Sequence, residues 1–121
     1  GDDFHFSIDI APDVDASSVR IPSMFIQIMT ENSIKHALRN KEGIKLLSIT
    51  VRHEHNNTVI RVTDNGPGFN PVTLRRKTGM NIISQTIAVI NLHNKDKIRF
   101  DIHNIKGCEA ILKVPDGVKI E

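Results

Sequence analysis

The stretch TENSIKHAL, residues 30–38, decides how this chain is interpreted. On a helix Asn32, Lys35 and His36 lie at positions i, i+3 and i+4, so they share one face. One and two turns earlier the same stripe holds Ile28 and Phe25, so an apolar stripe becomes polar where it would reach the mouth of a core. A solvated helix end is the favoured interpretation of this pattern, unless another segment supplies partners for the polar side chains.

The segment TVIRVTDNGPGF, residues 58–69, is the candidate for such a partner. Ile60 and Val62 point to one side of a strand, and Asp64 ends the strand on that same side. Gly66 and Gly68 follow and free the backbone to approach a flat or bulky ligand. A plain Asn-Gly turn is the alternative. The combination of D-x-G-x-G-F with an upstream E-N-x-x-K-H helix favours a ligand site.

Periodicity assigns most of the remaining chain. Alternating apolar and polar residues predict half-buried strands at 4–10, 46–55, 58–64, 97–103 and 108–114. Helical spacing predicts one helix from Pro22 to between Asn40 and Gly43 and another over 80–91, with Met80, Ile83, Ile87 and Ile90 on its apolar stripe. Turns are expected at 56–57 and 106–107.

This order of elements predicts the fold class. Strands joined by antiparallel hairpins rather than by βαβ units, together with two helices, indicate an α+β protein. We expect a two-layer sandwich in which a mixed, mostly antiparallel sheet carries both helices on one face. Residues 1–121 are interpreted as one domain of a longer protein.

Composition narrows the class of protein. The chain has 39% hydrophobic residues, and its 16 basic and 14 acidic residues leave a net charge of +2, which fits a soluble globular domain. No basic block with interleaved aromatic residues is present, so a nucleic-acid partner is not expected. No apolar run is long enough to cross a membrane. The one cysteine, Cys108, excludes an internal disulfide and is interpreted as a small core residue.

His53 and His55 stand two residues apart on a predicted strand. Such a pair has the spacing of metal ligands, but no cysteine or further acidic ligand accompanies it. A polar pair at the end of a strand is the favoured interpretation.

At this point the chain resembles a known family. TENSIKHALRNKEG is similar to the N-box, and DNGPGF to the first glycine box, of the GHKL ATP-binding domains. The pattern I-P-x-x-x-x-Q-x-x-x-E-N-x-I-K-H, which starts at Ile21, resembles LytS/YehU-type sensor histidine kinases. The resemblance implies a catalytic domain that binds ATP and phosphorylates a histidine on a separate helical dimerisation domain. It also implies a downstream response regulator and a cytoplasmic domain of a membrane-anchored protein.

The resemblance assigns roles at the N-box. Asn32 corresponds to the Mg²⁺ ligand, since its amide oxygen suits a hard cation. Glu31 is expected to reach the metal through water. Lys35 and His36 would lie toward the phosphates.

It assigns further roles around the glycine boxes. Asp64 corresponds to the group that accepts a hydrogen bond from the exocyclic amine of adenine, with Gly66 and Gly68 closing the backbone over the base. Residues 69–78 would form a lid, mobile without nucleotide. The second helix would direct backbone N–H groups at the phosphates. The residues expected to contact nucleotide in the lid and at this helix are Phe69, Lys77, Thr78, Gly79 and Met80.

Two positions depart from the family pattern. The second glycine box reads KTGMN, with Lys77 in place of a glycine, so a non-catalytic nucleotide-binding or docking module with a degenerate lid is the alternative function. Ile28 stands where the ATP-hydrolysing members carry a catalytic glutamate. Without a carboxylate to activate water, transfer to a partner histidine fits better than a chaperone- or topoisomerase-like ATPase.

Overall fold

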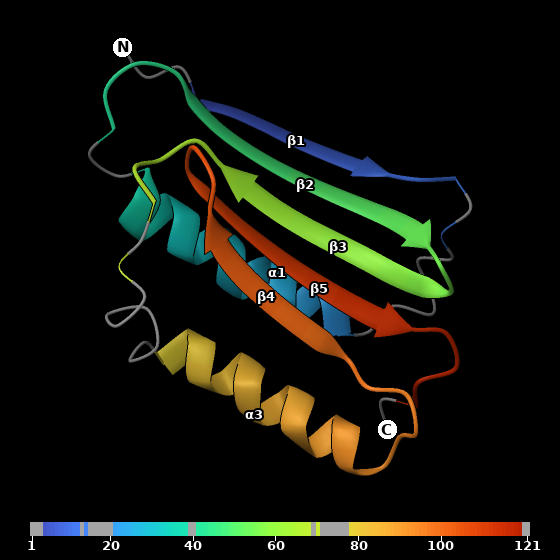
Figure 1. The fold of residues 1–121 in the computed structure, drawn as a ribbon. Coiled ribbons are helices and arrows are strands. Elements are labelled where there is room, and N and C mark those ends of the chain that lie inside the picture. The colour runs from blue at the N-terminus through green and yellow to red at the C-terminus, as the bar shows by residue number, and fades with distance from the viewer. Residues whose placement is uncertain are drawn as a thin grey trace.

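The computed structural model describes residues 4–12, 14, 21–38, 41–68, 70 and 78–119. Its elements follow the chain in the order shown in Figure 1. The strands are β1 (Phe4–Ile10), β2 (Lys45–Glu54), β3 (Asn57–Asp64), β4 (Arg99–Asn104) and β5 (Cys108–Pro115). The helices are α1 (Ile21–Asn32), the π-helix η2 (Ser33–Ala37) and α3 (Thr78–Leu92).

The strands form one sheet in the order β1-β2-β3-β5-β4. The pairs β2–β3, β3–β5 and β5–β4 are antiparallel, whereas β1 runs parallel to β2. The expectation of hairpins without any βαβ unit is therefore wrong at the start of the chain. The segment between Ile10 and Lys45 contains a helix and is long enough for the crossover that a parallel pair requires.

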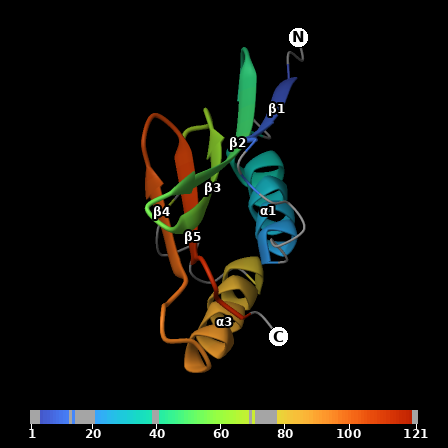
Figure 2. The ribbon, with the colours of Figure 1, turned by 90° about the vertical axis from the view of Figure 1, so that its right-hand side faces the viewer.

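Both long helices lie on the same side of the sheet, as Figure 2 shows. Leu47, Ile49 and Val51 of β2 are buried on this side, while the alternate residues of β2 face the open side. Phe25 of α1 packs edge-on against Phe100 of β4, with ring centroids 5.5 Å apart. Most of the predicted apolar stripe of α3 is buried in the same core, with Ile87 partly buried. The predicted two-layer α+β sandwich with a mixed sheet is confirmed.

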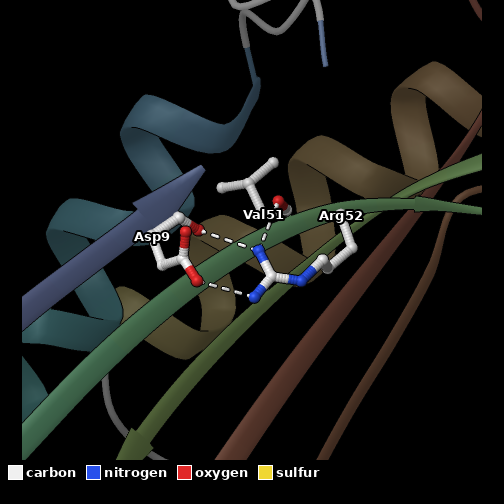
Figure 3. A network of polar contacts seen from close by, with 3 residues as sticks. All are labelled: Asp9, Val51 and Arg52. Carbon is white, nitrogen blue, oxygen red and sulfur yellow. Dashed lines mark hydrogen bonds and ion pairs between the residues drawn. The ribbon is translucent and has the colours of Figure 1, made fainter. Parts of the chain in front are cut away.

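The edge strand β1 differs from the half-buried strand that its alternation predicts. Its side chains are exposed on both faces, because α1 lies across β3 and β5 rather than across β1. On the open face, Arg52 of β2 donates from Nη2 to Oδ2 of Asp9 at 2.7 Å (Figure 3). Arg52 also donates from Nη1 to the carbonyl oxygens of Asp9 and Val51, both at 3.4 Å. β1 is joined to the sheet by its parallel pairing with β2, and this exposed ion pair adds a side-chain contact to it.

The β2–β3 turn lies one residue earlier than predicted. His55 and Asn56 have φ values of +50° and +65°, the left-handed pair that a two-residue hairpin turn requires, and Asn57 already belongs to β3. His53 pairs with Asp116 at 2.8 Å. No group of three or more metal-ligating side chains occurs among the described residues.

Within the described part of the chain, no helix is both long and apolar enough to span a bilayer.

Candidate functional site

The predicted N-box helix changes its geometry where its polar residues begin. α1 ends at Asn32, and the next turn is a π-helix in which the N–H of Leu38 donates to the carbonyl of Ser33 at 2.8 Å. A π-turn holds more residues than an α-turn, so the α-helical spacing used for prediction does not apply here. Ser33, the first residue of this turn, still continues the buried stripe of Phe25 and Met29, whereas Lys35 is exposed. π-turns of this kind occur frequently at functional sites.

Asp64 is the centre of the site. Its side chain is buried at 4% exposure, and both carboxylate oxygens accept hydrogen bonds. Oδ2 accepts from Ser33 Oγ at 2.7 Å, and Oδ1 accepts from the backbone N–H groups of Gly66 at 2.9 Å and Cys108 at 3.3 Å. The described residues offer no cation to it. Hydrogen-bond donors from three separate segments thus fix a buried carboxylate in one orientation.

The β4–β5 turn closes against this carboxylate from the opposite direction. Gly107 has a φ of +155°, and a Cβ atom there would lie 2.0 Å from the carbonyl oxygen of Asp64, so only glycine fits. The next residue, Cys108, is buried. Burial first, and then the carboxylates of Asp64 and Glu109, raise the pKa of the Cys108 thiol from 9.0 to about 12. The thiol is therefore neutral beside Asp64.

Asn65, the residue after Asp64, links the end of β3 to the segment at the start of β2. Asn65 Oδ1 accepts from the N–H of Leu46 at 2.8 Å, and its Nδ2 donates to the carbonyl of Ile44 at 2.9 Å. Gly68 has a φ of +93°, and a Cβ there would meet Asn104 Oδ1 at 2.6 Å. The glycine-rich segment is therefore more than a simple turn, because its first residues are tied to two neighbouring parts of the sheet.

The start of α3 meets α1 at Asn32. Nδ2 of Asn32 donates to the Sδ of Met80 at 3.5 Å, and nothing among the described residues donates to its Oδ1. A Cβ at Gly79 would lie 2.8 Å from Cγ2 of Ile28, so glycine lets the two helices approach closely. Asn32 is the residue that the sequence predicts as a metal ligand. Its amide therefore lies between the N-box helix and the beginning of α3.

The structure brings a large part of the predicted site together. Asn32 contacts Met80, its neighbour Ser33 contacts Asp64, and Asp64 accepts from Gly66, while Glu31 and Lys35 are exposed on the same helical segment. For His36 and Thr78 only the backbone is described. Phe69, Lys77 and nearly all of the predicted lid fall outside the described residues.

A hollow of about 440 Å³ lies at the other end of β3, away from Asp64. Its lining includes Asn57, Arg99 and Lys113 and is mostly polar. None of the predicted site residues contributes to it.

Sequence reasoning missed three contributors to the site, namely Ser33, Asn65 and Gly107. Ser33 stands next to Asn32 in the quoted motif, so a buried hydroxyl beside a buried carboxylate could have been considered. Gly107 carries no such signal, because its role depends on a contact with a residue far away in the sequence.

The chain is similar in sequence to sensor kinases. It is 28% identical over 102 residues to the sensor protein LytS of Staphylococcus haemolyticus, covering 84% of this chain and 18% of that protein. It is 30% identical over 80 residues to the sensor histidine kinase YpdA of Escherichia coli, covering 66% of this chain and 14% of that protein. The chain thus spans less than a fifth of the length of these two relatives. No model of a known protein family matches it.

Solved structures share its fold. The histidine kinase domain of a blue-light activated histidine kinase from Erythrobacter litoralis superposes with a TM-score of 0.73 at 12% identity, over 93% of this chain and 51% of that one. The catalytic domain of histidine kinase ThkA superposes with a TM-score of 0.62 at 14% identity, over 93% of this chain and 79% of that one. In sequence and in fold, the chain is therefore a relative of the catalytic domains of LytS-like sensor histidine kinases, as its two boxes predicted.

Proposed function

We propose that this domain binds Mg²⁺-ATP and transfers the γ-phosphoryl group to a histidine on a separate helical dimerisation domain. A response regulator would then receive the phosphoryl group, and the reaction would take place in the cytoplasm. The observation that carries the proposal is the 2.7 Å hydrogen bond from Ser33 to Asp64. It joins the N-box to the first glycine box around a buried carboxylate.

The carboxylate of Asp64 suits an adenine base. A buried acceptor at the end of a strand favours a ligand edge that carries an N–H donor, such as the exocyclic amine of adenine, over the corresponding carbonyl of guanine. Ser33 and the N–H groups of Gly66 and Cys108 hold the carboxylate in place, so little reorientation is needed when a base arrives. The missing side chain at Gly66 would let the base approach the backbone, whereas the side chain of Asn104 already lies beside Gly68.

The donor set around Asn32 fits Mg²⁺. The amide oxygen Oδ1 and the exposed carboxylate of Glu31 are hard ligands on one helical segment, of the kind that binds Mg²⁺ together with phosphates and water. A bound Mg²⁺ would neutralise negative charge on the phosphates. Lys35 is exposed one turn further and adds a positive charge, and His36 follows it in the same π-turn.

The start of α3 suits the phosphates. Backbone N–H groups at the first turn of a helix have no partner within the helix, so those of Thr78, Gly79 and Met80 are available to an anion. Lys77 precedes them and would add charge. Ile28 packs near Gly79 and offers no base to activate water, which favours transfer to a histidine over hydrolysis.

Calorimetric titration with a non-hydrolysable ATP analogue, with and without Mg²⁺, tests the binding step. Asn32→Ala should remove the gain in affinity that Mg²⁺ provides and leave metal-free ADP binding nearly unchanged. Gln27→Ala is the matched control, because Gln27 is an exposed amide on the same helix. Equal losses for both ligands would make Asn32 a structural residue and would contradict the metal assignment.

Radiolabelled ATP tests the transfer step. The domain should label a histidine when it is mixed with the helical domain of its own protein. Binding without labelling would leave the non-catalytic module as the function of this chain.

A further inference from the structure

The edge strand β1 carries a row of apolar side chains that nothing in the described structure covers. Phe4, Phe6, Ile8 and Ile10 are 43%, 48%, 57% and 49% exposed. They pair in register with β2 and so lie on the helix side of the sheet, beside the buried Leu47 and Ile49. α1 leaves this side of β1 open because it lies across β3 and β5. An exposed apolar edge strand of this kind is a surface on which another strand can add.

The backbone of the same strand has unpaired hydrogen-bonding groups. The N–H of Ala11 donates to the carbonyl of Val51 at 2.9 Å, and the parallel register places Ile10 beside Val51. In a parallel pair this means that odd-numbered residues of β1 direct their N–H and C=O groups toward β2. The even-numbered residues, which carry the apolar side chains, therefore direct theirs to the open edge.

The sequence of β1, FHFSIDI, is palindromic by residue class about Ser7. If a second copy runs antiparallel with Ser7 opposite Ser7, Phe6 lies opposite Ile8 and Phe4 opposite Ile10. These are the residues whose backbone groups face outward, so they can exchange hydrogen bonds.

In the same register His5 lies opposite Asp9, on the open face of the sheet. They form the pair type in which side chains approach most closely, and the imidazole of His5 can donate a hydrogen bond to the carboxylate of Asp9. Asp9 is already fixed at this edge by Arg52 at 2.7 Å (Figure 3). One register thus satisfies the backbone, the apolar row and the polar row together.

We propose that β1 is the interface of a symmetric homodimer, in which two copies add edge to edge and join their sheets. The occupant is a second copy, because the strand complements itself in residue class, in side-chain hydrogen bonding and in backbone register, as a two-fold interface requires. The pairing would bring the two apolar rows side by side and bury part of each. The proposal does not depend on nucleotide binding.

Sedimentation of the chain, whose mass is 13.6 kDa, gives the first test. We expect twice this mass for the wild type at concentrations on the order of 100 µM, since single-strand interfaces are small. Ile8→Lys should give a monomer. Val89→Lys is the matched control, because Val89 is also 57% exposed but lies on α3, and it should leave the dimer unchanged. A monomeric wild type, or equal behaviour of the two lysine variants, would overturn the proposal.

Charge exchange tests the register without touching the apolar row. His5→Asp places two carboxylates opposite each other and should weaken self-association at least about tenfold. Asp9→Lys should also weaken it, whereas a mixture of the two variants should form heterodimers, detected by native mass spectrometry. No preference for the heterodimer would overturn the antiparallel register.

Hydrogen exchange tests whether something other than a second copy covers β1. Residues 4–10 could exchange quickly in the 121-residue chain and be protected only in the longer protein. In that case another segment of the longer protein covers β1, and the homodimer is wrong.

Discussion

At the scale of single residues, the site depends on how one carboxylate is held. Asp64 is buried, yet the described residues give it only neutral donors: a hydroxyl and two backbone N–H groups. Sequence alternation predicts the side of β3 on which Asp64 lies, and that prediction is confirmed. The hydrogen bond from the N–H of Gly66 is a local contact two residues along the chain, whereas those from Ser33 and Cys108 follow from no local pattern. The role of Asp64 in reading adenine remains a prediction, and it leads to two experiments.

Asp64→Asn should weaken ATP binding at least about tenfold, because a hydrogen bond to a charged group is worth about 1.5 to 3 kcal/mol. Discrimination between ATP and GTP should also decrease, because the amide can both donate and accept. Titration calorimetry with both nucleotides measures the two effects. Asp101→Asn, on the exposed part of β4, serves as the control. Wild-type affinity in Asp64→Asn would mean that the base binds elsewhere.

Ser33→Ala should lower the free energy of unfolding by about 1 to 3 kcal/mol, because Oδ2 of Asp64 loses the donor that lies 2.7 Å away. Urea denaturation measures this loss. Ser48→Ala is the matched control and should change stability by less than about 0.5 kcal/mol, because Ser48 is half-buried on the open face of the sheet. Equal stabilities of the two variants would show that the hydroxyl contributes little.

At the scale of elements, local patterns predict the strands well and their ends less well. The five strands occur where alternation places them, with no bound displaced by more than two residues. The β2–β3 turn begins at His55, one residue before the Asn-Asn pair, and histidine is among the residues that adopt the left-handed region more often than most. The π-turn after Asn32 is another local deviation, and its first residue, Ser33, donates a hydrogen bond to the carboxylate of Asp64.

Gly107→Ala should destabilise the fold by more than about 2 kcal/mol, since the added Cβ would collide with backbone rather than with a mobile side chain. Gly43→Ala is the control for backbone strain alone. Gly43 has a φ of +83° but nothing within 4 Å of its would-be Cβ, so its replacement should cost about 1 kcal/mol. Urea denaturation compares the two variants. A Gly107→Ala loss no greater than that of Gly43→Ala would mean that the β4–β5 turn moves away from Asp64 without cost.

At the scale of the whole molecule, stability should depend on pH through Cys108. Its pKa is raised from 9.0 to about 12 in the folded chain, so the folded state keeps a proton that the unfolded state releases. This contribution to stability is complete below about pH 9 and is lost as the pH rises from about 9 toward 12.

Urea unfolding of the wild type and Cys108→Ala across this range measures the effect. The difference in unfolding free energy should stay constant below about pH 8 and shift against the wild type above about pH 9. A difference that does not change up to about pH 10.5 would mean that the thiol titrates alike in both states.

The sequence by itself determined the α+β class, the positions of the strands and long helices, and the two boxes that mark the family. It could do so because alternation, helical spacing and short motifs depend on residues that are neighbours along the chain. The tertiary structure decided the parallel placement of β1, the exposure of its apolar row, and the partners of Asp64. Ser33 lies 31 residues from Asp64 and Cys108 lies 44 residues from it, so no local pattern could pair them. Only packing of the N-box helix and the β4–β5 turn around the end of β3 brings these groups within hydrogen-bonding distance.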